Sequence, residues 1–276
     1  MNAIRYSLTS FGNETRKGLL VAWSEKLQIL LELPFFALIL LMLGPLLGEG
    51  HLVVAGHVHW SLNSARTSDL VLWFVPFTYF YMQVVKLFWR LLSEIQSGTL
   101  EQVYLSPLSS WLVVAGGRVA AALAEAMLVA AGLYGIVSVF VPLRYHWTAT
   151  ALLPAVLLVI TVIGFSLIIA GMTIRWKRIQ LINETVMIAA MIFSASAVPL
   201  VHLPGWMAAD GRYFPVTNAI ASLNGVMLGH RGVTAPWGPG GLVWGLITAA
   251  AYLAAGIIAF RIFERAAKVG GSLARY

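Results

Sequence analysis

The sequence predicts an all-α integral membrane protein with six transmembrane helices. Of its 276 residues, 59% are hydrophobic and 11% are charged, and the mean hydropathy of +0.83 leaves too little polar surface for a soluble globule. The apolar residues form runs long enough to cross about 30 Å of hydrocarbon as a helix, which takes ~20 residues. These six runs lie at about 27–47, 70–91, 112–141, 149–174, 181–201 and 238–260. We therefore expect a transmembrane domain over about 27–260, preceded by residues 1–26 and followed by a cytoplasmic tail, 261–276.

The basic residues predict the orientation. The net charge is +7, and six spans place Arg66, Arg144, Arg212 and Arg231 outside, which leaves fourteen of the eighteen Lys and Arg residues at the cytoplasmic side. Because cytoplasmic loops carry an excess of Lys and Arg, both termini are expected in the cytoplasm. The basic residues are scattered over span ends, so no nucleic-acid partner is expected. The absence of cysteine from the sequence excludes disulfides and thiolate metal sites.

Residues 1–26 are expected to form an amphipathic helix at the membrane interface. Apolar positions such as Ile4 and Leu8 are interrupted by the polar stretch 13–17, and Trp23 suits a membrane boundary. The alternative is a solvated tail that leads into the first span. No apolar core followed by small residues is visible here, so we expect no cleaved signal peptide.

Three carboxylates, Glu32, Glu125 and Glu184, lie in the apolar runs, where exposure of a charge to lipid is costly. Glu32 is expected to pair with Lys26 or with a neighbouring helix. Glu125 follows Arg118 by seven residues on the same face, and we expect an ion pair or a hydrogen-bonded structural role for it. A place along a transport path is the alternative for these buried charges. Small residues in the third run are expected to let another helix approach closely: Ala115, Gly116, Gly117, Ala120, Ala121, Ala124 and Ala131.

Two outer segments connect the spans. The loop 48–69 carries His51, His57 and His59, a spacing that suits a metal on a strand, but no carboxylate is fixed beside them and we expect solvated histidines. The segment at about 202–236 predicts two short re-entrant helices in the outer leaflet, with their backbone groups satisfied by protein.

A polar segment, 94–109, separates the second and third runs and predicts a short amphipathic helix over about 98–108. Gly98 permits a sharp change of direction, Thr99 caps the next turn, and Pro107 ends it. Its apolar side is expected to be Leu100, Val103, Tyr104 and Leu108, and its polar side Glu101, Gln102 and Ser106. The polar side is thus available to water or to a partner.

This segment resembles the first cytoplasmic loop of ABC type-2 exporter permeases, which runs roughly Glu-Arg-x-x-Gly-Thr-Leu-Glu-x-x-x-x-(Ser/Thr)-Pro-Leu. The matching residues are Glu94, Gly98, Thr99, Leu100, Glu101, Ser106, Pro107 and Leu108, and Ile95 stands where an Arg is usual. A weaker similarity precedes the last span, where Leu203, Pro204, Gly205 and Trp206 resemble a Leu-Pro-x-Trp turn, and Pro215, Val216 and Thr217 resemble an Asn-Pro-Leu-Thr helix start. Phe214 replaces the usual Asn there, and Asn224 stands near a common Arg.

The resemblance implies an ABCG-like transmembrane fold and the membrane subunit of an ATP-driven exporter in the plasma (bacterial inner) membrane. The implied partners are two copies of a separate ABC ATPase, a second copy of this permease or a related one, and membrane lipid. ATP and Mg are then bound by the ATPase, and this chain is expected to hold no cofactor, no metal and no catalytic residue. The resemblance makes 98–108 a coupling helix, and the residues expected to couple to the ATPase are Glu94, Gly98, Thr99, Leu100, Glu101, Tyr104 and Pro107.

Missing motifs distinguish this interpretation from two alternatives. No Gly-x-x-x-x-Gly-Lys-(Ser/Thr) loop occurs, so the energy for transport must come from another chain. An intramembrane enzyme rests only on the three buried carboxylates, because neither His-Glu-x-x-His nor Gly-x-Ser-x-Gly is present. An ion-coupled secondary transporter or channel is the other alternative, although no repeat relates 27–141 to 149–260.

Aromatic and Met residues of the first, second and fifth spans are the expected substrate path: Phe35, Phe36, Phe77, Tyr79, Met187, Met191 and Phe193. Such surfaces suit amphipathic molecules and tolerate variety, so the expected cargo is an amphipathic drug or a lipid-linked or polysaccharide-type molecule. The alternative is that these residues serve only helix packing.

Overall fold

The computed structural model describes residues 2–24, 26–46, 64–105, 117–140, 143–194, 204–211, 213–229 and 241–270, and these form helices and turns with no strand. The helices are α1 (Asn2–Ser24), α2 (Lys26–Leu46), α3 (Ser64–Gln96), α4 (Thr99–Leu105), α5 (Val119–Phe140), α6 (Leu152–Trp176), α7 (Gln180–Phe193), α8 (Gly205–Gly211), α9 (Thr217–Met227) and α10 (Leu242–Val269). The prediction of an all-α protein is confirmed for the described residues.

Four helices of the described part are long and apolar enough to cross a membrane: Ser68–Gln96 in α3, Val119–Val139 in α5, Ala149–Trp176, which comprises a 3-10 turn and the whole of α6, and Leu242–Val269, which forms α10. These candidate membrane helices coincide with the second, third, fourth and sixth predicted spans. The first predicted span falls on α2, and the fifth begins on α7, an apolar helix of 14 residues. Because 195–201 lie outside the described residues, the count of six spans and the orientation stay predictions.

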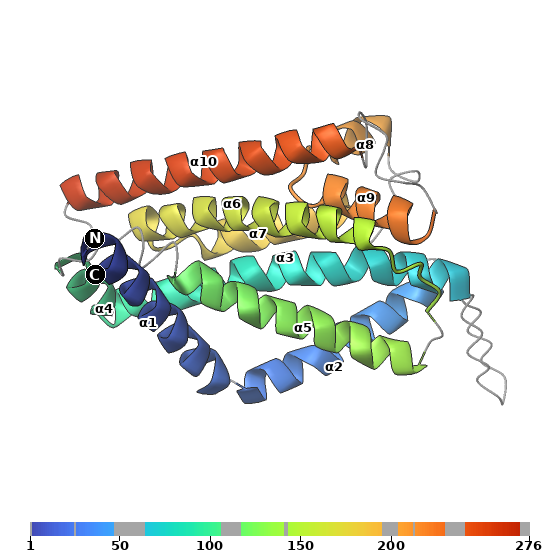
Figure 1. The fold of residues 1–276 in the computed structure, drawn as a ribbon, viewed down its shortest axis with the longest axis horizontal. Coiled ribbons are helices and arrows are strands. Elements are labelled where there is room, and N and C mark those ends of the chain that lie inside the picture. Colours follow the sequence, from blue (N-terminus) through green and yellow to red (C-terminus); the bar gives the residue numbers. More distant parts are fainter. Residues whose placement is uncertain are drawn as a thin grey trace.

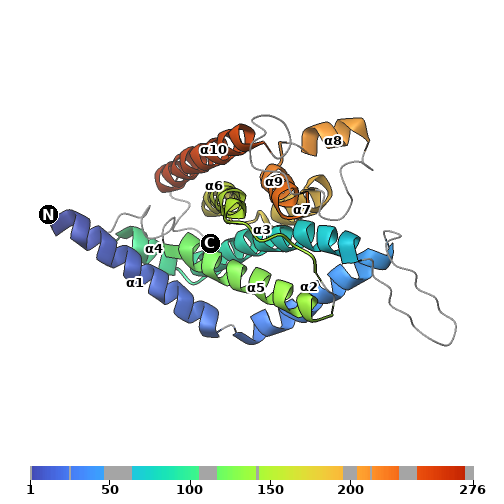
Figure 2. The same cartoon turned by 45° about the vertical axis from the view of Figure 1, so that its right-hand side comes forward.

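The helices are arranged in successive layers. Figure 1 shows α3, α5, α6 and α10 running alongside one another, with α4 and the end of α10 at one end of the bundle and α8 and α9 at the other. In Figure 2, α1 and α2 lie on one side, α3 and α5 come next, α6, α7 and α9 follow, and α10 with α8 lies on the far side. The helix α4 is therefore far from the short outer helices.

The core is centred on α3. Its side chains Phe80, Leu87, Phe88 and Leu91 are fully buried, because α3 packs against α2, α5, α6, α7 and α9. Polar residues recur on the same helix, including Gln83, and they too are buried. The side-chain amide of Gln83 donates a hydrogen bond to the carbonyl oxygen of Val119 on α5, 3.3 Å away, which supplies a partner where a membrane bundle offers no water.

Glycine residues bring α6 and α10 into backbone contact. A Cβ atom on Gly256 would collide with the carbonyl oxygen of Gly164, and one on Gly164 would collide with the backbone of Tyr252. About two helical turns beyond Gly164, a Cβ on Gly171 would lie 2.9 Å from the Cα of Phe260. Small residues at these positions let the two helices pack closely, as they do in membrane helix pairs.

The helix α1 crosses the beginning of α5. The predicted close approach at small residues is confirmed for Gly117 and Ala121, which contact Glu14 and Gly18 of α1. The first two residues of that predicted set, 115 and 116, lie outside the described residues. Large apolar side chains of α1 remain uncovered by protein, among them Trp23, as expected for a helix at a membrane interface; its place in a membrane stays a prediction.

The two short helices predicted between the last two spans are present as α8 and α9. The side chain of Asn224 on α9 donates a hydrogen bond to Asp69 at the start of α3. The ring of Phe193 at the end of α7 stacks on Phe214, with 5.7 Å between centroids and an interplanar angle of 18°. These contacts hold α9 and the turn before it on the bundle, and a position within the outer leaflet stays a prediction.

Candidate functional site

The short helix α4 begins after a left-handed glycine. Gly98 has φ +71°, a conformation that L side chains rarely adopt, and it reverses the chain between α3 and α4. Thr99 was expected to cap the next turn, but it is the first residue of α4, and its hydroxyl donates a hydrogen bond back to the carbonyl oxygen of Glu94, 3.3 Å away. Leu100 is 2% exposed, whereas Gln102 is exposed and Glu101 partly so. The predicted division of this helix into two sides is thus present over 99–104, and Ser106, Pro107 and Leu108 lie outside the described residues.

Tyr104 fixes α4 to the end of α10. The Lys268 ammonium lies 4.8 Å from the centre of the Tyr104 ring, and it forms a salt bridge of 3.0 Å with Glu264. Burial raises the pKa of Tyr104, and the nearby carboxylate of Glu264 raises it further. A cation over the face of an aromatic ring is attracted by the ring quadrupole. The apolar side of α4 therefore rests on α10 as well as on α3.

Arg118 at the start of α5 joins three helices. Its Nε donates to a carboxylate oxygen of Glu94 at 2.6 Å, and its Nη1 lies 3.4 Å from a carboxylate oxygen of Glu14 on α1. Glu94 was expected to contact the ATPase, and the structure directs one of its carboxylate oxygens to Arg118 inside this chain. The turn before α4 is consequently tied to both α5 and α1.

A second group of charges lies between α2, α3 and α5. The ammonium of Lys86 pairs with Glu32 at 2.9 Å and with Glu125 at 3.0 Å, and Arg90 pairs with Glu125 at 2.8 Å. The expected structural role of both carboxylates is therefore supported. Of the two partners expected for Glu32, the structure shows the neighbouring helix, through Lys86 of α3, and not Lys26. Two cations and two anions balance one another, so none of the four charges is buried without a counter-ion.

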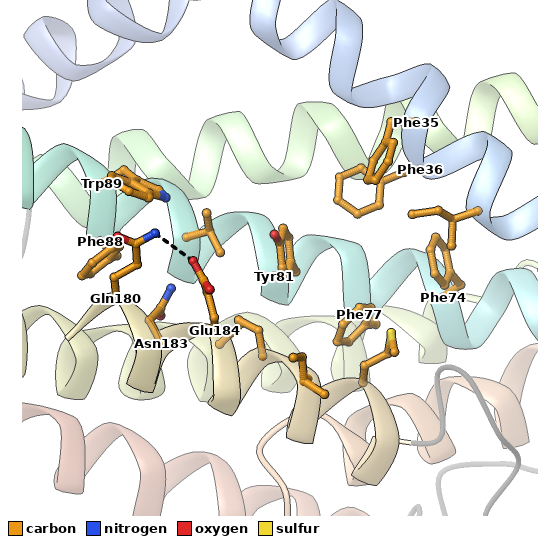
Figure 3. A pocket seen from close by; sticks show the side chains of 15 residues that line it. Phe35, Phe36, Phe74, Phe77, Tyr81, Phe88, Trp89, Gln180, Asn183 and Glu184 are labelled. Carbon is orange, nitrogen blue, oxygen red and sulfur yellow. Dashed lines mark hydrogen bonds between the residues drawn. The ribbon is translucent and has the colours of Figure 1, made fainter.

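A hollow with a volume of about 340 Å³ opens between α2, α3 and α7, and we call it the aromatic pocket. Figure 3 shows Phe74, Phe77, Tyr81, Phe88 and Trp89 of α3 on one side and Gln180, Asn183 and Glu184 of α7 opposite the last two. Five predicted path residues line it: Phe35, Phe36, Phe77, Met187 and Met191. The pocket has the size and largely apolar lining of a small-molecule site.

The sequence matches the family described as ABC-2 family transporter protein over residues 54–268, more than three quarters of the chain. The chain belongs to the ABC-2 transporter family. It is thus the membrane component of an ABC transporter, and such components have no nucleotide-binding domain of their own. Membership of this family therefore implies an ATPase partner. No curated protein matches the chain. The family decides against the secondary transporter, the channel and the intramembrane enzyme that the sequence left open.

Two predicted path residues of this ABC-2 protein lie away from the aromatic pocket. Tyr79 faces the other side of α3, where it lines an apolar hollow of about 400 Å³ together with residues such as Met127 of α5 and Leu158 of α6. Phe193 packs on Phe214 beyond the pocket. Neither residue reaches the pocket in this structure.

Several residues of the aromatic pocket were not singled out from the sequence as path residues. On α3, the lining extends from Phe77 by helical steps to Phe74, Tyr81 and Phe88, and on α7 it extends from Met187 in the same way. The helical period of 3.6 residues applied to either starting residue finds them. The lining residues missed by the sequence analysis are Ile39, Phe74, Tyr81, Val85, Phe88, Trp89, Gln180, Asn183 and Ile188. Glu184 also lines the pocket, but it was predicted as a buried charge and its side chain is exposed in the structure.

Metal binding has no support within the described residues, where no group of three or more metal-ligating side chains occurs. The predicted histidine loop falls largely outside them, since 47–63 are not described and with them His51, His57 and His59.

Proposed function

We propose that this ABC-2 protein is the permease subunit of an ATP-driven exporter. Two copies of the chain, or this chain and a related one, would enclose the transport path, and two ATPase subunits that hold ATP and Mg would dock on the cytoplasmic side. The observation that carries this proposal is the geometry of α4, which has one side anchored on the bundle and a polar side that presents Glu101 and Gln102.

The contacts of α4 give its movement a route into the membrane domain. Closure of the ATPase pair around ATP would push α4, which is linked to α3 through the turn at Gly98 and to α10 through Tyr104. Glu94 adds a link to Arg118 on α5. The same α3 helix forms the longest wall of the aromatic pocket, so a shift of α3 relative to α2 and α7 would change access to it. This is a change between two packed arrangements of helices.

The proposed export path includes the aromatic pocket, and the proposed cargo is an amphipathic drug or a lipid-linked or polysaccharide-type molecule. The mixture of aromatic walls with a few polar groups at one end supports an amphipathic cargo. We further propose six spans over 27–260, both termini in the cytoplasm and a plasma (bacterial inner) membrane location. The excess of Lys and Arg at the α4 end supports this orientation.

Uncoupling of ATP hydrolysis from transport tests the role of α4. We expect Gly98→Pro combined with Glu101→Lys to insert normally, because both positions lie at the end of the bundle, yet to lose at least about tenfold in ATP-driven transport. Proline fixes φ near −65°, which is incompatible with the φ of +71° at Gly98. The measurement is ATP-dependent export by the chain reconstituted in liposomes with a Walker-containing ATPase encoded beside it.

The control for the charge reversal is Arg144→Glu. Arg144 is exposed and lies beside Ser68 at the far end of α3, roughly 40 Å from α4 at 1.5 Å per residue, so wild-type coupling is expected. Wild-type coupling in the double variant contradicts the proposal. Solute movement by the chain alone, driven by an ion gradient without nucleotide, contradicts it as well.

A further inference from the structure

The aromatic pocket is polar at one end only. Gln180, Asn183 and Glu184 lie on the first turns of α7, beside Trp89, whereas the lining further along is aromatic, aliphatic or Met (Figure 3). A molecule that fits this pocket therefore carries its polar group at one end and an apolar body along α3.

Glu184 gives the polar end a negative charge. Its carboxylate is exposed and accepts one hydrogen bond, from the side-chain amide of Gln180 at 2.9 Å. Within the described residues it forms no ion pair, in contrast to the carboxylates of Glu32 and Glu125. A carboxylate at the mouth of an apolar pocket without a counter-ion attracts a cation.

The nearby cations of α3 do not neutralise Glu184. Lys86 and Arg90 are held by Glu32 and Glu125 on the other side of α3, and their side chains are 7% and 8% exposed. Neither of them lines the aromatic pocket, nor does any other Lys or Arg of the described residues. The lining therefore carries a net negative charge.

Asn183 adds a hydrogen-bond acceptor to this end. Its side chain is 2% exposed, and its Oδ1 atom accepts no hydrogen bond from any described residue. A buried acceptor without a donor is costly, and a ligand that brings an N–H group removes that cost. Ammonium groups supply such donors, and quaternary ammonium groups do not.

The aromatic wall suits the same class of ligand. Phe77 and Tyr81 lie 6.3 Å apart between ring centroids, and Phe36 of α2 contacts Tyr81 edge to face, with 5.7 Å between their centroids. Aromatic faces attract organic cations and stack with aromatic bodies. The volume of about 340 Å³ accommodates a molecule of drug size.

We propose that the aromatic pocket selects protonated amines with an aromatic or apolar body. The ammonium group would lie against Glu184 and donate to Asn183 Oδ1, and the body would extend along α3 towards Phe74. This names the cargo class of the exporter and rests on the function proposed above. The rival class is an amphipathic anion, because Lys177 and Arg178 line a separate polar hollow that shares Gln180 and Glu184 with the pocket.

Binding of three naphthalene derivatives tests the selection by charge. The three compounds share one aromatic ring system and differ in the charge of the head group. They are 1-naphthylmethylamine (cationic), 1-naphthylmethanol (neutral) and the carboxylate of 1-naphthaleneacetic acid (anionic). We expect the purified chain in zwitterionic nanodiscs at neutral pH to bind the amine about tenfold more tightly than the other two, as measured by equilibrium dialysis. In Glu184→Gln, this preference should fall to about twofold or less while the affinity for the alcohol is kept.

Two more variants separate the roles of the α7 residues. Asn183→Leu should remove the preference for the amine over its N,N,N-trimethyl derivative, because only the amine donates hydrogen bonds. Thr185→Ala is the matched control, since Thr185 follows Glu184 on α7 but does not line the pocket, and its hydroxyl bonds the Leu181 carbonyl. In this control, the affinities for the amine, the alcohol and the naphthalene carboxylate should equal those of the wild type.

Three results overturn the proposal: the naphthalene carboxylate binds as tightly as the amine or more tightly, the preference for the amine is unchanged in Glu184→Gln, or the amine does not bind up to about 1 mM. If the naphthalene carboxylate binds and this binding is lost in Lys177→Gln, the site is assigned to anions instead. Binding needs no ATPase, so amine selectivity without ATP-driven export would contradict only the proposed function. Export without amine selectivity would contradict only this inference.

Discussion

Loss of the Glu125 charge should destabilise the bundle more than loss of any exposed carboxylate. The Glu125 side chain is fully buried, and its two oxygens pair with Lys86 at 3.0 Å and Arg90 at 2.8 Å. Within the described residues Glu125 is the sole carboxylate partner of Arg90, whose Nη1 already lacks a hydrogen bond. Glu125→Gln would therefore leave Arg90 as a buried cation without a counter-ion.

The expected loss follows from that unpaired charge. Removal of one partner from a buried ion pair costs about 3–5 kcal/mol. At roughly 2–4 °C per kcal/mol for a chain of this size, the melting temperature should fall by roughly 6–20 °C. Lys86 keeps its pair with Glu32, so Glu125→Gln should disturb the α3–α5 contact more than the α2–α3 contact.

The assay is thermal unfolding of the purified protein in detergent, with two comparison variants. Glu184→Gln removes a carboxylate that is exposed and has no ion pair among the described residues, so its stability should change by about 0.5 kcal/mol or less. Arg90→Leu combined with Glu125→Gln removes both charges and should recover at least about half of the loss. A melting temperature of Glu125→Gln equal to that of Glu184→Gln would refute the reasoning.

Two further variants test other contacts of the bundle. Gly256→Ala should destabilise the protein by about 1–3 kcal/mol in the same assay, because the added Cβ would meet the Gly164 carbonyl oxygen. In the control Gly135→Ala, the added Cβ meets nothing within 4 Å, so the variant should be neutral or stabilised by up to about 1 kcal/mol. Equal melting temperatures of the two variants would contradict the close α6–α10 contact. Arg118→Gln breaks the contacts with Glu94 and Glu14, so amide hydrogen exchange across α1 should accelerate while exchange in α10 stays unchanged, and unaltered exchange in α1 would show that these ion pairs do not hold it.

The apolar runs were sufficient to predict most helices. The bilayer thickness sets the length of a spanning helix, so long runs such as those of α6 and α10 are identified by counting. The turn at Gly98 and the short helix α4 were also predicted, because glycine and the residues that follow it act locally. Features that depend on sequence neighbours were therefore available from the sequence.

The ion pairs depend on how helices face one another, so the sequence predicted that Glu32 and Glu125 would be paired but did not identify the partner residues. Glu125 follows Arg118 by seven residues, a rise of about 10.5 Å along one helix, which is too far for a direct ion pair. The packing of α3 against α5 instead brings Lys86 and Arg90 to Glu125 and leaves Arg118 for Glu94. No pattern within one helix determines such partners.

The path residues show the same limit at the scale of one helix. Tyr79 was expected to line the path, whereas Tyr81, two residues later, lines the aromatic pocket. Two residues correspond to about 200° of rotation, so the two rings point to nearly opposite sides of α3. The choice between them required the positions of α2 and α7, which only the folded chain provides.

The contact between α6 and α10 at Gly164 and Gly256 has a mechanical consequence. Since backbone touches backbone there, neither helix can slide along the other without opening a gap that no side chain fills. We therefore expect α6 and α10 to move as one rigid unit. This unit contacts α4 at one end, where the Lys268 ammonium lies over the Tyr104 ring. In the proposed transport cycle, a push on α4 would tilt α6 and α10 together, and α2 and α7 would be the helices that shift relative to them.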